Sequence, residues 1–94
     1  MDRDEARTVL AAHLEPLRRR SYGELIGQMG DIQVAEVVGP SGTAYQIEVE
    51  VIWDSPREKT DVRVLGAIDD GRLPGSLSPV HDSFVVARPG GDGR

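Results

Sequence analysis

Strict alternation of apolar and polar residues near the middle of the chain constrains its fold more than any other feature. Every second residue from Tyr45 to Trp53 is β-branched or aromatic, and the residues between them include Gln46, Glu48 and Glu50. Because successive side chains of a strand point to opposite faces, this period of two predicts a strand with one buried and one wet face. No helix would gather these apolar residues on one stripe, so the chain is expected to fold around a sheet.

An amphipathic helix is predicted before this strand, over residues 2–20. Its apolar residues recur at helical spacing and form one stripe. Acidic residues lie near its start and arginines near its end, which suits the helix dipole. Pro16 interrupts the pattern, because its ring clashes with the carbonyl four residues earlier. We therefore expect a kink or a break near residues 13–15.

A short second helix and further strands complete the predicted elements. Ser21 and Glu24 have the spacing of a capping box, and this second helix should stop near Gly30. The period of two then predicts further strands at residues 32–38, 61–68 and 83–87. In the first of these, Ala35 and Val37 are assigned to the outer face. Turn residues separate the strands, as in an antiparallel meander.

These elements predict an α+β fold. The helix, kinked near Pro16, and the short second helix should pack on one face of a three- to four-stranded antiparallel meander sheet. Residues 1–88 are expected to form a single domain, because 94 residues are too few for a second core. Residues 89–94 are rich in Gly and Pro and are expected to be a flexible C-terminal tail.

Composition excludes several functional classes. The chain has no cysteine, which removes disulfides, thiol nucleophiles and cysteine metal sites. Its net charge of −5 opposes binding to a nucleic-acid backbone, although Arg18 to Arg20 form one basic cluster. The charged N-terminus lacks a signal-peptide pattern, and no apolar run is long enough to span a membrane. We therefore expect a cytoplasmic protein that binds neither nucleic acid nor membrane and needs no cofactor.

Four residues form a candidate surface site: Asp69, Asp70, His81 and Asp82. Carboxylates beside an imidazole can bind a divalent metal or share a proton. The competing interpretation is that Asp69 and Asp70 are turn residues before Gly71, and that Asp82 precedes a strand. No metal-ligand spacing joins the four, so turn chemistry is the favoured interpretation and no catalytic or metal-binding residue is assigned.

The polar side of the central strand is a second candidate. Glu48 and Glu50 should lie on the outer face of the sheet, where they can meet Arg63 on the next strand. The alternative is that this acidic face receives a basic partner. The sequence leaves both open, so Glu48, Glu50 and Arg63 are treated as a candidate interaction face.

The second half of the chain resembles a small family of uncharacterised bacterial proteins. The resemblance is carried by residues 45–54, by residues 61–71 and by the segment Asp82-Ser83-Phe84, with a Ser-Tyr-x-Glu-Leu segment at residues 21–25 before them. It implies a fold but no activity or ligand. A bacterial origin, of an actinobacterial kind, also agrees with the basic residues, which are arginines except for Lys59.

Two functional hypotheses follow. The favoured one is a small non-catalytic binding or protein-interaction domain, with a protein partner or a second copy as its ligand, because no catalytic constellation is present and a thin core favours association. The alternative is a small metal-dependent or acid–base enzyme that uses Asp69, Asp70, His81 and Asp82 around the segment from Gly71 to Asp82.

Overall fold

The computed structural model describes residues 1–71 and 79–90. Within them, two helices, α1 (Arg3–Arg18) and α2 (Tyr22–Gln28), precede the strands β1 (Gln33–Val38), β2 (Ala44–Trp53), β3 (Val62–Asp69) and β4 (Val80–Val86). The predicted α+β arrangement is confirmed. Part of the segment from Gly71 to Asp82 on which the enzyme hypothesis depends, and the last four residues of the predicted tail, lie outside the described residues.

Helix α1 begins at a capping residue and buries the predicted stripe. The Asp2 carboxylate accepts hydrogen bonds from the backbone N–H groups of Asp4 and Glu5, both at 3.1 Å. These are donors that no helical carbonyl can reach. The buried residues of the helix are Ala6, Val9, Leu10 and Leu14.

Of the kink or break expected near residues 13–15, the break does not occur. Helix α1 continues through Pro16 and ends at Arg18. Pro16 and Ala12 are both exposed, so the missing helical hydrogen bond lies on the solvent side, where water can replace it. The helix then closes with short-range bonds from the N–H of Arg19 to the Pro16 carbonyl and from Arg20 to Leu17.

Helix α2 is short and is held at both its start and its side. The predicted capping box is present: the Ser21 hydroxyl accepts from the N–H of Glu24, and the Glu24 carboxylate accepts from the N–H of Ser21. Leu25 is fully buried in the core. The Tyr22 hydroxyl donates to the Thr60 carbonyl at 2.6 Å, which ties α2 to the loop between β2 and β3.

The strands form an antiparallel meander in the order β1-β2-β3-β4. The register between each pair of neighbours is continuous, so none of the described strands contains a bulge. Strand β4 begins at Val80 rather than at Ser83 as predicted, because Val80, His81 and Asp82 already pair with β3. Phe84 and Val86 of this strand pack against the core.

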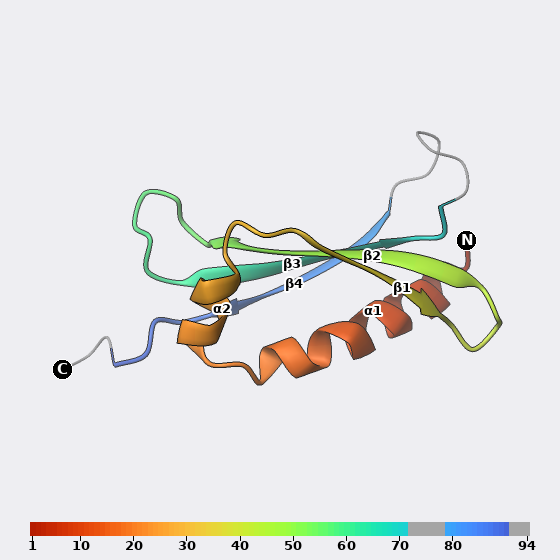
Figure 1. Cartoon of the computed structure of the whole chain (residues 1–94), viewed down its shortest axis with the longest axis horizontal. Helices are drawn as coiled ribbons and strands as arrows, with labels where there is room; N and C mark the ends of the chain where they lie inside the picture. Colours follow the sequence, from red (N-terminus) through yellow and green to blue (C-terminus); the bar gives the residue numbers. More distant parts are fainter. Residues whose placement is uncertain (72–78, 91–94) are drawn as a thin grey trace.

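Both helices cover the same face of the sheet (Figure 1). Helix α1 lies over β3 and β4, and α2 contacts β2 and β3. The apolar face of the central strand is buried as predicted, with Tyr45, Ile47, Val49 and Val51 in the core. Among the described residues, no helix has the length and apolar character needed to cross a membrane.

The predicted facing of β1 is wrong. Ala35 and Val37 lie opposite Ile47 and Tyr45 and therefore share the helix-covered face with them. Val34 and Val38, on the other face, remain exposed. Both sides of β1 are largely apolar, so its own sequence carries no signal that separates inside from outside. The pairing with β2 decides the matter.

Gly66 allows α1 to approach the sheet closely. A Cβ atom at this position would lie 3.0 Å from Leu10 Cδ1 and 3.1 Å from Leu14 Cδ1. Such distances are shorter than the ~3.5–4.0 Å that two carbon atoms prefer. Gly66 therefore makes room for α1, and the continuous register excludes a bulge at this position.

Candidate functional site

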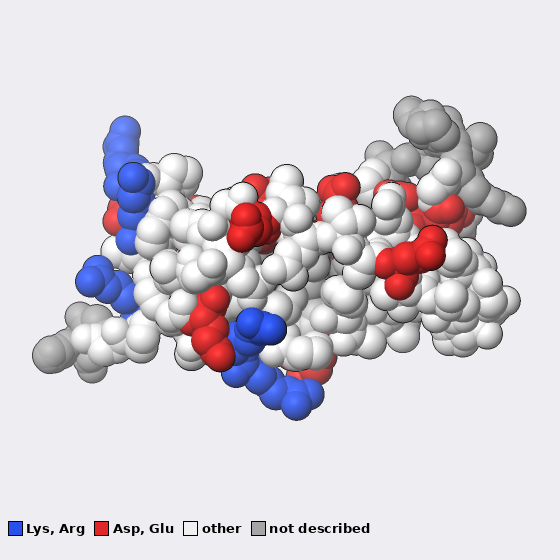
Figure 2. All heavy atoms as spheres, in the orientation of Figure 1, with Lys and Arg blue, Asp and Glu red and all other residues white. Residues whose placement is uncertain are grey.

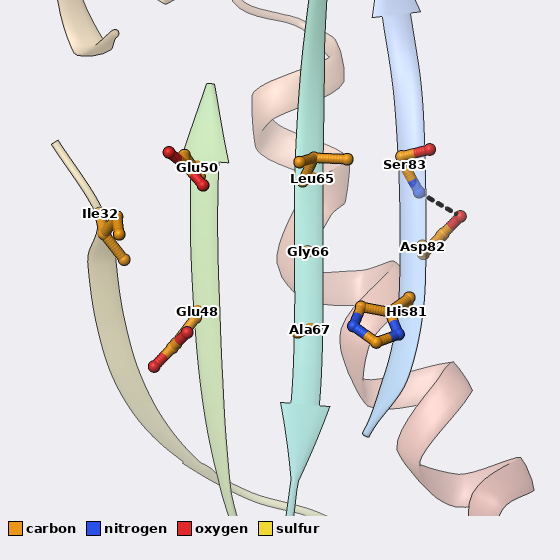
Figure 3. Close-up of a pocket in the computed structure, with 9 residues that line it drawn as sticks. All are labelled: Ile32, Glu48, Glu50, Leu65, Gly66, Ala67, His81, Asp82 and Ser83. Atoms are coloured by element: carbon orange, nitrogen blue, oxygen red, sulfur yellow. Dashed lines mark hydrogen bonds between the residues drawn. The ribbon is translucent and has the colours of Figure 1, made fainter. Parts of the chain in front are cut away.

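The helix-free face of the sheet holds an open groove of about 560 Å³. Its lining comes from Ile32, just before β1, and from the three strands β2, β3 and β4 (Figure 3). Leu65 and Ala67 of β3 form the floor, and both are partly exposed. The face that the helices leave uncovered therefore contains an apolar depression, whereas most of a wet sheet face is polar.

Two carboxylates on β2 border this groove. Glu48 and Glu50 lie opposite Ala67 and Leu65 in the strand register, and Glu48 leans toward β1 (Figure 3). Neither side chain has a hydrogen-bond or ion-pair partner within residues 1–71 and 79–90. The groove therefore combines an apolar floor with negative charge that the described part of the chain does not neutralise.

The pairing of Arg63 with these carboxylates, one of the two alternatives that the sequence left open, does not occur. It lies opposite Ile52, near the end of β2. Its guanidinium instead donates to the Asp54 carboxylate, with Nη2 at 2.8 Å and Nε at 2.9 Å from Oδ1, and to the Ser83 hydroxyl at 2.9 Å. Of the candidate interaction face, Glu48 and Glu50 line the groove, and Arg63 is engaged at one end of the sheet.

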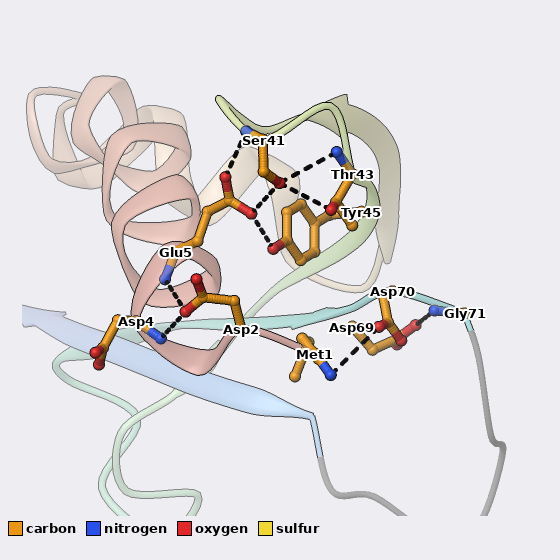
Figure 4. Close-up of polar contacts among 10 residues, drawn as sticks. All are labelled: Met1, Asp2, Asp4, Glu5, Ser41, Thr43, Tyr45, Asp69, Asp70 and Gly71. Carbon is orange, nitrogen blue, oxygen red and sulfur yellow. Dashed lines mark hydrogen bonds and ion pairs between the residues drawn. The ribbon is translucent and has the colours of Figure 1, made fainter.

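Of the four residues of the first candidate site, His81 and Asp82 both line the groove (Figure 3), and Asp69 and Asp70 lie at and just after the end of β3. Asp69 follows the outward alternation of β3, and its carboxylate accepts from the N–H of Gly71 at 2.7 Å, as a turn residue does (Figure 4). His81 lies opposite Ala67 and borders the groove on the helix-free face. These two groups are thus on the outer side.

Asp70 and Asp82 each pair with a cationic group from the N-terminal part of the chain. The Asp70 carboxylate lies 3.8 Å from the amino group of Met1 (Figure 4), and the Asp82 carboxylate lies 3.9 Å from the Arg18 guanidinium of α1. No group of three or more acidic or histidine side chains able to hold a metal ion occurs among the described residues. Asp69 acts as a turn residue, as the favoured interpretation holds, but Asp82 lies within β4, paired with Gly66, and does not precede the strand as predicted.

A polar cluster that the sequence did not reveal joins α1 to the β1–β2 hairpin (Figure 4). The Glu5 carboxylate accepts from the Tyr45 hydroxyl at 2.6 Å, from the Ser41 hydroxyl at 2.8 Å and from the Ser41 N–H at 2.8 Å. The bond from Tyr45 and then those from Ser41 lower the pKa of Glu5. The same bond, with desolvation and nearby acidic charge, raises the pKa of Tyr45 to about 12. Within the described chain, the hydrogen bonds of the Glu5 carboxylate all come from Ser41 and Tyr45, so this cluster holds the start of α1 against the β1–β2 hairpin.

The basic cluster at the end of α1 is largely engaged within the fold. The Arg18 guanidinium lies 4.6 Å from the centre of the Phe84 ring, in addition to its contact with Asp82, and Arg19 lies 3.8 Å from Glu15. Figure 2 shows Lys and Arg at the left end and along the helical lower side of the molecule. Away from that left end, the charged side chains along the upper, sheet side are acidic.

Comparisons with protein-family models, with curated proteins and with solved structures gave no match for this chain. The resemblance to a bacterial family therefore stays a prediction. The geometry of the groove carries the functional argument.

Proposed function

We propose that this chain is a non-catalytic protein-interaction domain of the bacterial cytoplasm, and that the helix-free face of its sheet receives the partner. One observation carries the proposal: an apolar groove of about 560 Å³ bordered by two carboxylates without partners in the described part of the chain. Open apolar surface rimmed by polar groups is typical of sites where another molecule docks.

Exposed apolar side chains lie in and beside β1, and one of them, Ile32, lines the groove. The large hydrophobic residues most exposed in the described chain are Ile32 at 59%, Val34 at 56% and Val38 at 66%, and all three lie in or beside β1. Single exposed hydrophobic residues are common on protein surfaces, but these alternate along one side of one strand. Covering them with a partner removes apolar surface from water, which favours association.

Charge supports a basic partner. Glu48 and Glu50 contribute negative charge to the groove, in a chain whose net charge is −5. Lys or Arg side chains of a partner would neutralise them and speed the encounter of the two proteins. The same charge repels a nucleic-acid backbone, so a protein surface that combines apolar and basic residues fits best.

The geometry favours this function over the enzyme hypothesis. Asp69 and His81 lie on the outer face, whereas the carboxylates of Asp70 and Asp82 pair with Met1 and Arg18, although Asp82 also lines the groove beside His81. General acid–base catalysis and metal binding both require groups that converge on one point. An interaction surface needs no such convergence.

The proposal is tested by nuclear magnetic resonance with two defined peptides. Both have twelve residues and the same valine and threonine content, and the charged positions are Lys in one and Glu in the other. Titrating the ¹⁵N-labelled protein with the Lys peptide should shift amide signals of the groove, including those of Glu48, Leu65 and Ala67. The Glu peptide should shift none, because it brings like charge to the groove.

Charge variants make the test specific. The double substitution Glu48→Gln and Glu50→Gln should weaken binding of the Lys peptide. The control, Glu15→Gln with Glu58→Gln, removes the same charge from α1 and from the loop after β2 and should change the affinity little. If both variants bind equally well, or if the shifts map to the helical face, the proposed site is wrong.

A further inference from the structure

The free edge of β1 exposes a defined set of backbone groups. The N–H of Gly39 donates to the Thr43 carbonyl at 2.9 Å, so the pair Gly39–Thr43 is hydrogen-bonded. In an antiparallel pair, hydrogen-bonded and non-hydrogen-bonded positions alternate along the strand. The register therefore directs the N–H and C=O groups of Val37 and Ala35 toward β2.

The alternate residues of β1 direct their backbone groups outward. These are Val34, Glu36 and Val38, and their side chains lie on the helix-free face. No backbone hydrogen bond from these three residues to a loop, a turn or a cap is found within the described chain. Strand β1 therefore presents a row of open donors and acceptors with a row of exposed side chains beside it.

This edge lacks most of the features that usually prevent strand addition, although Glu36 places one charge on it. Natural edge strands carry Lys or Pro, contain a bulge or lie under another element. Strand β1 has neither Lys nor Pro, and its register with β2 is unbroken. The opposite edge, β4, is different, because α1 lies against it and Arg18 contacts both Asp82 and Phe84 there.

The charges on this side select the kind of strand that fits. Glu36 is the charged residue of β1, and Glu48 lies directly across from Val34 on β2. Neither carboxylate has a partner in the described residues. A second copy of this chain would bring its own Glu36 and Glu48 to the same edge, and like charges across strands are unfavourable. A basic strand neutralises them instead.

We propose that the free edge of β1 binds an extended segment of a partner protein as a fifth strand. The segment has the pattern apolar-x-basic-x-apolar, with a Lys or Arg beside Glu36 and apolar residues beside Val34 and Val38. Main-chain hydrogen bonds hold the segment, and the alternate side chains select it. This inference rests on the proposed function, because the added strand places the partner beside the groove at Glu48 and Glu50.

Amide exchange with water tests the binding mode on the unsubstituted protein. The probe is the Lys peptide with a Val-Thr-Lys-Thr-Val core. In the free protein, the N–H groups of Val34, Glu36 and Val38 should exchange fast, and those of Ala35 and Val37 should exchange slowly and serve as internal controls. Saturating peptide should slow the first three by about ten-fold or more, since each gains a hydrogen-bonded carbonyl.

A proline variant provides a second measurement. Val34→Pro removes one outward N–H and leaves the bonds from β1 to β2 intact, as edge strands tolerate. Peptide affinity should fall about three- to ten-fold, the value of one hydrogen bond, whereas Val34→Thr, which keeps the N–H, should change it less than about two-fold. If the proline variant does not fold, the exchange measurement decides alone.

The outcomes separate the two proposals. Binding that shifts the groove signals without slowing exchange at Val34, Glu36 and Val38 overturns strand addition and leaves the proposed function standing. Absence of any binding by the Lys peptide overturns both. Protection of the same three amides in the protein alone at high concentration would show that the occupant is a second copy, which also overturns the inference.

Discussion

Replacing Gly66 by alanine tests how closely α1 must approach the sheet. The added methyl group would lie 3.0 Å from Leu10 Cδ1 and 3.1 and 3.2 Å from the two Cδ atoms of Leu14. Both leucines are fully buried, so neither can turn its methyl groups into solvent. Restoring ordinary contact requires a shift of about half an ångström in the helix or in these side chains.

The expected loss of stability follows from two opposing effects. Overpacking a core costs about 1–3 kcal/mol. Replacing a glycine inside a strand regains about 0.5–1 kcal/mol, because alanine has less conformational freedom to lose. The free energy of unfolding of Gly66→Ala should therefore fall by about 0.5–2 kcal/mol.

Urea denaturation measures this loss, with a second glycine as the control. Gly27 lies exposed in α2, and a Cβ atom there would meet nothing within 4 Å. Gly27→Ala should therefore raise the free energy of unfolding by about 0.5–1 kcal/mol. The reasoning is refuted if Gly66→Ala unfolds at the same urea concentration as the unsubstituted protein or at a higher one, while Gly27→Ala shows its expected gain.

Three further predictions concern the ties between elements. Hydrogen bonds from Tyr45 and the hairpin lower the pKa of Glu5 in the folded protein. Ionised Glu5 therefore stabilises the fold at pH values above its ordinary pKa of 4.5. This stability is lost as the pH falls through the lowered pKa of the folded state. Glu5→Gln should flatten the acid side of a plot of urea midpoint against pH, and an unchanged slope would contradict the assignment. The pKa of Tyr45 is raised to about 12. The protonated Tyr45 hydroxyl therefore stabilises the fold below pH 10, and this stability is lost toward pH 12. An absorbance titration should show one tyrosine ionising near pH 12, and at a lower pH in Glu5→Gln. Ser21→Ala removes half of the capping box and should lower the free energy of unfolding, measured by thermal unfolding, by about 1 kcal/mol. Leu25→Ala empties a fully buried position and should lower it by about 2–5 kcal/mol. Equal losses in the two variants would mean that α2 contributes little to the core.

Local pattern was sufficient where one side of an element was apolar and the other polar. The alternation from Tyr45 to Trp53 predicted both the existence of β2 and its buried face, and the pair Ser21 and Glu24 predicted the start of α2. In these segments, the residues that define the element also decide which side is covered. Hydrophobic burial then enforces the same choice in the folded chain.

Tertiary structure decided whatever depended on contacts between distant residues. Strand β1 is apolar on both sides, so only its pairing with β2 turned Ala35 inward and left Val34 exposed. The register between β2 and β3 placed Arg63 beside Asp54 and away from Glu50. The bond between Glu5 and Tyr45 joins residues 40 positions apart, a separation at which no local period carries information.

The apolar and polar faces of the central strand thus follow from its local residue pattern alone. The candidate site is different, because Glu48 and Glu50 were expected on the outer face, but their lack of partners among residues 1–71 and 79–90 depended on strand register. The groove and the open edge of β1 likewise arise only when the strands pair and the helices settle on one face. The alternation of side chains along a strand is a local property of the sequence. Strand register, and the choice of the sheet face that the helices cover, are set by long-range packing, and the proposed interaction surface depends on both.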